Sequence, residues 1–161
     1  MTTGRESTLR VLHCTGDEST GEDFAPIIAL VRVFGRINDA LRRVVKPHGL
    51  TVPFFEVLIV LIKYGEGVSQ QVVSKRLLVT KGNISIILKK MEAKGLIERR
   101  SNPTDQRFHL LYVTDAGRSV MAKIMPEHHA MIRRFVSQLS EEEQQTLTSL
   151  LKRVEESFVD K

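Results

Sequence analysis

Apolar residues recur at intervals of three and four along most of this chain, a spacing that predicts a mainly α-helical protein. The first stripe runs from Ile27 to Val45, and we expect Pro26 to open its helix because proline suits a first helical turn. A second helix is expected after Thr51, a typical capping residue. Its strongly apolar body, residues 54–61, predicts burial on more than one side.

The middle of the chain predicts two helices followed by a β-hairpin. Ser69 is expected to cap a short helix and Thr80 to cap a longer one. Residues 96–100 and 108–113 read as short strands, and the Asn-Pro-Thr-Asp segment from residue 102 is typical of the turn between them. This order of parts is suited to placing one helix in the DNA major groove and a hairpin over the neighbouring minor groove.

Two further helices are expected after the hairpin. Thr114 begins the first of them, and Pro126 must kink or split it because proline lacks a backbone N–H. The last helix carries a capping box, in which Ser140 is followed three residues later by Glu143.

The helix that Thr80 caps has one apolar side and one side of small or polar residues. At 100° per residue, its core-facing sector holds Ile84, Ile87, Leu88 and Met91. The opposite sector holds Gly82, Ile86, Lys89 and Ala93, flanked by Ser85, Asn83 and Lys90. Such a side, near the start of a helix, is what a recognition helix presents to base edges.

Individual residues of this outer side allow two interpretations each. Ile86 is either an isolated surface hydrophobe or a contact for a thymine methyl group. Asn83 and Lys89 could bind adenine and guanine edges, or could equally contact phosphates or only solvent. Gly82 lacks a Cβ and so would let the backbone approach a partner closely.

The net charge of +5 is concentrated in one part of the sequence. Residues 68–110 hold nine Lys or Arg residues and three acids, a local charge of +6, so the remainder sums to −1. A basic block in a near-neutral chain indicates a surface for polyanions, although a merely solvated basic surface remains the alternative. The side chains and helix start expected to suit phosphates are Lys75, Arg76, Arg99, Arg100, Ser69 and Gln70.

The predicted turn carries Asp105 and Arg107. Arg107 could enter a narrow A·T-rich minor groove. The alternative is a local salt bridge between the two residues. The two interpretations are compatible if Asp105 orients the side chain of Arg107.

Composition places the chain among ordinary globular proteins, with 42% hydrophobic and 27% charged residues. The longest apolar run, residues 57–62, is far below the ~20 residues of a membrane helix, and no signal peptide is visible, so we expect a cytoplasmic protein without membrane contact. Residues 1–22 are expected to form a mobile arm. Cys14, the single cysteine in that arm, is expected to be an inert thiol.

With these residues in view, the chain resembles the MarR family of winged helix-turn-helix regulators over about residues 26–159. The resemblance rests on GLTVPFFEVL, on VSQQVVSKRLLVTKGNISIILKKMEAKGLIERR, and on Asp105-x-Arg107 followed by Leu111-x-Val113-Thr114. It implies a mainly α fold with a two-stranded β-wing and an all-helical dimerisation layer. The winged helix-turn-helix would span about residues 50–114, and the dimerisation helices about 24–47 and 115–159, within one domain of residues 23–161.

What the resemblance implies for function is a homodimeric repressor that binds a pseudo-palindromic double-stranded DNA operator and is released by a small phenolic or anionic ligand. Residues 80–90, which include Thr80 and Lys81, would contact the major groove, and Arg107 the minor groove. Asn38 and His48 are weak candidates for ligand contact, more simply explained as satisfied core or boundary residues.

Other classes of function are less well supported. An enzyme is not expected, because no catalytic set or phosphate-binding loop stands at a useful spacing. No cofactor and no bound metal are expected, since Glu127, His128 and His129 are adjacent and lack the i, i+4 spacing of a helical metal site. A metal-responsive regulator, or a winged helix used only for protein contacts, stays open as an alternative.

Overall fold

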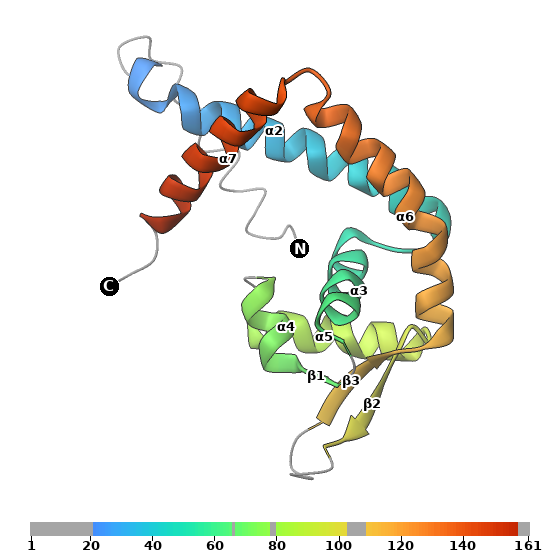
Figure 1. The fold of residues 1–161 in the computed structure, drawn as a ribbon. Helices are drawn as coiled ribbons and strands as arrows, with labels where there is room; N and C mark the ends of the chain where they lie inside the picture. Colours follow the sequence, from blue (N-terminus) through green and yellow to red (C-terminus); the bar gives the residue numbers. More distant parts are fainter. Residues whose placement is uncertain (1–20, 66, 78–79, 103–108, 158–161) are drawn as a thin grey trace. The chain divides into compact units, whose positions relative to one another are not determined.

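The computed structural model describes residues 21–65, 67–77, 80–102 and 109–157, so most of the expected N-terminal arm lies outside the described residues. The chain divides into two compact units, Met1–Arg43 and Val44–Lys161. The described part of the first unit belongs to helix α2, Gly21–Val45. The second unit contains η2 (Lys46–His48), α3 (Val52–Tyr64), β1 (Val68–Ser69), α4 (Gln70–Arg76), α5 (Lys81–Ala93), β2 (Ile97–Ser101), β3 (His109–Val113), α6 (Asp115–Val136) and α7 (Glu141–Glu156), as Figure 1 shows.

The N-terminal helix begins earlier than the sequence predicted. Helix α2 starts at Gly21, so Pro26 lies inside it and does not open it. Pro26 is the sixth residue of this helix, where proline removes one backbone hydrogen bond and crowds the carbonyl four residues earlier, and the helix continues through it. The helix ends at Val45, and a 3-10 turn then leads to Gly49, whose φ of 73° is readily adopted by glycine.

Helix α3 forms the centre of the core of the second unit. Six of its residues are buried: Phe54, Phe55, Val57, Leu58, Val60 and Leu61. Thr51 occupies the N-cap position with an extended backbone, as expected, but its side chain makes no capping hydrogen bond.

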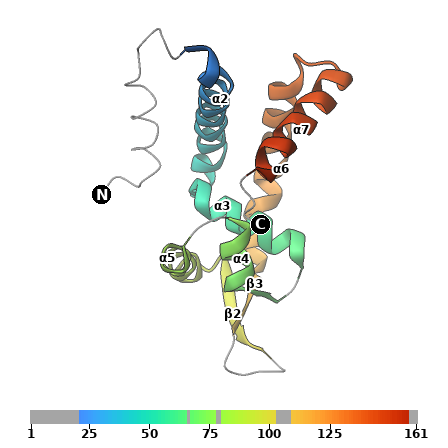
Figure 2. The same ribbon diagram turned by 90° about the vertical axis from the view of Figure 1, so that its left-hand side faces the viewer.

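The predicted hairpin is present, and a third short strand joins it. Strands β2 and β3 pair antiparallel with Ile97 opposite Val113, and β1 pairs with the other edge of β3 through Val68 and Leu111. The strand order is therefore β1-β3-β2. Strand β1 is only two residues long, too short for any periodicity to reveal it. Figure 2 shows the β2–β3 hairpin projecting from the body of the second unit.

Helix α6 runs through Pro126 without a break, so the proline does not split it. Its ribbon bends along its length, in agreement with the kink that was the other expectation (Figure 1). The capping box at the start of α7 is confirmed: Ser140 accepts a hydrogen bond from the N–H of Glu143, whose carboxylate accepts one from the N–H of Ser140. Among the described helices, none is by itself both long and apolar enough to cross a membrane.

The start of α6 is tied to the end of α5 by several close contacts. The hydroxyl of Thr114 accepts a hydrogen bond from the N–H of Gly117 at 3.1 Å and donates one to the carbonyl of Gly95 at 2.6 Å. The backbone N–H of Thr114 also donates to the carbonyl of Leu96 at 3.2 Å. Because Gly95 and Leu96 come just after Lys94, the C-cap of α5, these bonds hold the end of that helix against the C-terminal end of β3.

Candidate nucleic-acid interface

The rotation of α5 about its own axis is set by a fully buried stripe. Ile84, Leu88 and Met91 have no exposed surface, and Ile87 is half-buried. Thr80 caps the helix by accepting a hydrogen bond from the N–H of Asn83 at 3.3 Å. The core-facing sector predicted from the sequence is therefore confirmed, because only one rotation of the helix buries all three of these side chains.

This rotation leaves the opposite side of α5 open to solvent. Its four residues, Gly82, Ile86, Lys89 and Ala93, are all exposed, and Ile86 is 57% exposed. A Cβ added at Gly82 would meet no heavy atom within 4 Å. The outer side of α5 is thus a ridge of small and polar side chains around one aliphatic residue, and no described residue lies over Gly82 to keep a partner from its backbone.

One side of α5 is joined to α4 by a hydrogen bond between side chains. The amide Nε2 of Gln70, the first residue of α4, donates to the hydroxyl of Ser85 at 2.7 Å, and the bond is partly buried. Ser69, the residue before, accepts a hydrogen bond from the N–H of Val72 at 3.4 Å and so caps α4. The sequence suggested this helix start for phosphate contact, and in the structure the side chains of both residues also serve to build the helix-turn-helix.

The positively charged candidates fall into two groups: lysines without an ion pair among the described residues, and arginines that contact an aromatic ring or a carboxylate. Lys75, Lys89 and Lys90 are exposed, and none of them has an ion-pair partner among the residues that the structure describes. The guanidinium of Arg76 lies 4.7 Å from the ring centroid of Tyr64, at the end of α3. A cation–π contact of this kind still leaves the edge of the guanidinium able to bind a phosphate.

Arg99 and Arg100 lie on opposite faces of the sheet, because successive residues of a strand alternate. Arg99 is on the face that packs against α5, and its Nε lies 3.2 Å from a carboxylate oxygen of Glu92 in that helix. Arg100 is on the other face, where it pairs with Glu98 and lies 4.5 Å from the ring centroid of Tyr112. Of the two arginines, only Arg99 therefore borders the outer side of α5.

Some of the predicted site lies outside what the structure describes. Asp105 and Arg107 belong to the segment 103–108, which is not described, and only the backbone of Lys81 is described. Sequence reasoning also missed the acidic partners Glu92 and Glu98. The Glu98–Arg100 pair had a usable signal, because residues two apart in a strand share a face. Glu92 and Arg99 come from different elements, so no local pattern joined them.

The candidate ligand residues are engaged within the protein. The Nδ2 of Asn38 donates to the carbonyl of Phe34, one turn earlier in α2, at 3.0 Å. The Nε2 of His48 lies 3.8 Å from a carboxylate oxygen of Glu127 in α6. In the described part of the chain, no group of three or more His, Cys, Asp or Glu side chains is arranged to hold a metal ion.

His128 is more enclosed than the sequence suggested for this run of histidines. Its ring packs against Phe55 of α3 with the centroids 5.0 Å apart, and its Nδ1 is buried without a hydrogen-bond partner among the described residues. Burial lowers the pKa of His128 below the ordinary 6.5, and the charge of His129 lowers it further. This lowering favours the neutral ring as the form that packs from α6 against α3.

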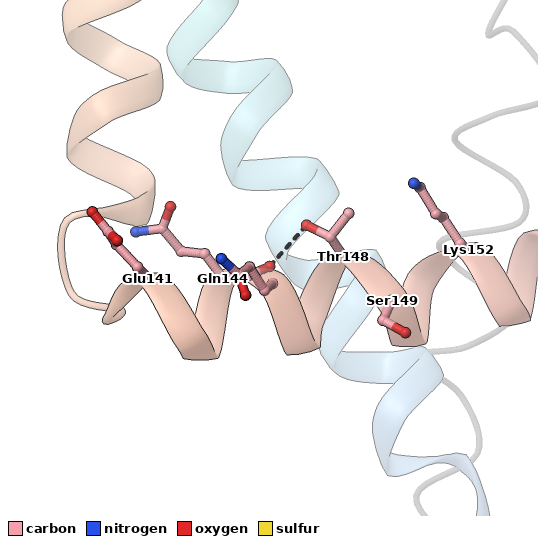
Figure 3. A pocket seen from close by; sticks show the side chains of 6 residues that line it. Glu141, Gln144, Thr148, Ser149 and Lys152 are labelled. Atoms are coloured by element: carbon pink, nitrogen blue, oxygen red, sulfur yellow. Dashed lines mark hydrogen bonds between the residues drawn. The ribbon is translucent and has the colours of Figure 1, made fainter.

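A surface hollow on α7 does not have the character of a binding site. It is lined by Glu141, Gln144, Gln145, Thr148, Ser149 and Lys152, all from this one helix (Figure 3). The hydroxyl of Thr148 is already used, since it donates to the carbonyl of Gln144 at 2.8 Å. No described side chain of a second element lines the hollow, so the outer side of α5 remains the stronger candidate surface.

Comparison with known proteins relates the chain to transcriptional regulators. A model of the MarR family matches residues 48–107. The HTH-type transcriptional regulator MhqR of Bacillus subtilis (strain 168) is 38% identical over 127 residues, which cover 79% of this chain and 87% of that protein.

Two solved structures are also similar. The transcriptional repressor CouR bound to a 23-mer DNA duplex has a TM-score of 0.69 and 29% identity, covering 79% of this chain and 89% of that one. CouR from Rhodococcus jostii RHA1 bound to p-coumaroyl-CoA has a TM-score of 0.75 and 23% identity, covering 90% and 99%, and shows the fold alone.

Proposed function

Because this chain belongs to the MarR family of transcriptional regulators, we propose that it is a homodimeric repressor that reads a pseudo-palindromic operator with α5. The observation that carries the proposal is the orientation of α5. A fully buried stripe holds it so that Ile86 and Lys89 point outward beside the small residue Gly82. A recognition helix needs this arrangement, because its backbone must come close to the base edges in the major groove.

The proposed DNA contacts follow from the two groups of cations. Lys75, Lys89, Lys90 and Arg76 are exposed, and we propose that they contact phosphates. We propose that Asn83 and Ile86, which are also exposed, meet base edges. We assign Arg100 no direct DNA contact, because it lies on the sheet face turned away from α5. Arg107 stays the proposed minor-groove residue on the strength of the sequence alone.

Exposed apolar side chains support the proposed homodimer. Helices α6 and α7 expose Ile132, Phe135, Val136, Leu147, Leu150, Leu151 and Val154, each between 37% and 50%. Helix α2 in the first unit exposes Phe24, Ile27, Leu30, Val33 and Phe34, each between 39% and 55%. So many large apolar residues on three helices exceed the scattered hydrophobes of a monomer surface, and a second copy of the chain would cover them.

We further propose that a small anionic or phenolic ligand releases the protein from DNA, because a repressor of similar fold has been solved with p-coumaroyl-CoA. His48 and Asn38 remain candidates for ligand contact. Adding compounds of both classes to the protein–DNA complex and measuring how much DNA is released would identify the effector class.

The test of DNA reading begins with duplexes that the protein selects from a pool of random sequence. We expect an inverted repeat with half-sites about one helical turn apart. Binding should weaken as salt rises, with a slope in log K of about −0.9 for each phosphate neutralised. The absence of any salt-dependent DNA affinity would instead support a module that acts only through protein contacts.

Two single variants separate the roles within α5. Lys89→Ala should weaken binding to selected and mixed sequences alike and reduce the salt slope by about 0.9. Ile86→Ala should reduce the preference for the selected sequence, by about fourfold if the burial of one methyl-sized apolar contact, ~0.8 kcal/mol, is lost. An unchanged preference in the Ile86 variant would identify that residue as an isolated surface hydrophobe.

A further inference from the structure

Strand β2 carries two neighbouring arginines, and each is paired with a different glutamate. Arg99 pairs with Glu92 of α5, and Arg100 pairs with Glu98 of its own strand. The two pairs lie on opposite faces of the sheet, because Arg99 faces α5 and Arg100 faces Tyr112. The strand thus contains two ion pairs of the same composition, of which only one borders the outer side of α5.

The Glu92–Arg99 pair lies beside the proposed DNA-reading residues. Glu92 is three residues after Lys89, so the two side chains are neighbours on the surface of α5. On the same helix, Glu92 lies almost two turns after Ser85, on the flank where Ser85 bonds to Gln70. The side chains of Arg99 and Glu92 are 27% and 41% exposed, so a DNA phosphate brought to α5 could reach the arginine.

An ion pair between two partly exposed side chains adds little to folding stability. Its effect on DNA binding is larger, because a carboxylate that pairs with a cation offsets its charge and restricts its position, so the cation neutralises a nearby phosphate less readily. A lysine such as Lys89, which has no ion-pair partner among the described residues, can reorient its side chain toward any nearby phosphate. Arg99, held through its Nε, can meet a phosphate only where the duplex docks in one position, and Glu92 itself repels the DNA backbone.

We propose that Glu92 is a specificity-determining residue, which holds Arg99 and so limits binding to DNA of arbitrary sequence. The proposal rests on the DNA-reading role proposed for α5. Contacts to phosphates provide affinity without sequence information. Because Glu92 holds Arg99, this surface has one fewer freely moving cation. We therefore expect the pair to lower the affinity for mixed sequence more than the affinity for the operator, where base contacts hold the duplex in register.

The second pair provides a matched control. Glu92→Gln and Glu98→Gln remove the same charge, keep nearly the same side-chain shape, and free neighbouring arginines of one strand. General electrostatic attraction would strengthen DNA binding in both variants alike. A local effect at the reading surface would appear only in the Glu92 variant.

The experiment measures binding of the full-length protein and of both variants to a short duplex of mixed sequence and to a selected operator, over a series of salt concentrations. Glu92→Gln should steepen the salt slope for mixed sequence by about 0.9, which amounts to about 3.5-fold more affinity lost over a fourfold rise in salt. Its preference for the operator should fall. Glu98→Gln should change the slope by much less.

A double variant tests whether the effect passes through Arg99. In Glu92→Gln/Arg99→Gln, the salt slope for mixed sequence should return to the wild-type value, and circular dichroism should show an intact helical fold. Equal effects of the two glutamate variants, or weaker binding by Glu92→Gln, would overturn the proposal while leaving the wild-type DNA binding in place. A wild-type protein without salt-dependent DNA binding would overturn the proposed function itself.

Discussion

Replacing Gly117 by alanine tests how α6 is joined to the helix proposed to read DNA. Gly117 is the third residue of α6, and its N–H donates to the hydroxyl of Thr114. A Cβ at this position would overlap the carbonyl oxygen of Leu96 and would lie 2.8 Å from the Cγ1 of Val113. Neither neighbour is the free end of a flexible side chain, so the backbone of α6 or of the residue-96 turn must move.

The expected size of the effect follows from opposing contributions. Helix propensity alone would favour alanine over glycine by about 1 kcal/mol. Overpacking costs about 1–3 kcal/mol, and a shift at Leu96 also weakens the bond that its carbonyl accepts from the N–H of Thr114, worth about 1 kcal/mol. We therefore expect Gly117→Ala to lower the free energy of unfolding by about 2 kcal/mol, opposite in sign to the propensity.

Urea unfolding followed by circular dichroism measures this change, at a fixed protein concentration because the stability of the proposed dimer would depend on concentration. Gly82→Ala is the control, since a Cβ there meets nothing within 4 Å. It should leave stability unchanged or raise it by up to about 1 kcal/mol. A Gly117 variant as stable as the Gly82 variant would refute the close packing of α6 against the turn at Leu96.

Two further predictions concern Gln70 and His128. Gln70→Ala removes the hydrogen bond to Ser85 and should weaken binding to the selected operator by about fivefold, the equivalent of about 1 kcal/mol. As a control, replacing the exposed Gln71 by alanine should change operator affinity less than twofold. Equal losses in the two variants would show that the Gln70–Ser85 bond does not contribute to DNA binding. His128 has a lowered pKa, so the unfolded chain binds its proton first, and the stability that the neutral ring contributes above pH 6.5 is lost as pH falls. His128→Leu should flatten this loss between about pH 7.5 and 5.5 in unfolding experiments, whereas an unchanged pH dependence would assign it to other groups.

The repeating pattern of apolar residues was sufficient to predict the core side of α5 and most of the helices. It succeeded because Ile84, Leu88 and Met91 can all be buried on one side of a helix only if they are spaced by three or four residues, and this spacing is visible in the sequence. The caps at Ser69, Thr80 and Ser140 were predictable for a similar reason, since a capping bond joins residues two or three positions apart.

Features that depend on distant partners were not predictable in this way. Strand β1 exists because Val68 is buried beside Leu111 of a later strand, and two residues have no pattern of their own. The start of α2 at Gly21 was missed because a local rule about Pro26 was applied where the longer helix overrides it.

By itself the sequence determined the helical framework, the basic block and the outward residues of α5, because each depends on neighbours within about two turns or on charge alone. Only the tertiary structure decided which side chains each arginine of β2 contacts. Arg99 and Arg100 are adjacent and chemically identical, yet strand alternation turns one toward Glu92 on α5 and the other toward Tyr112. Their different roles come from which elements pack against each face of the sheet, and that packing is settled only when the whole chain has folded.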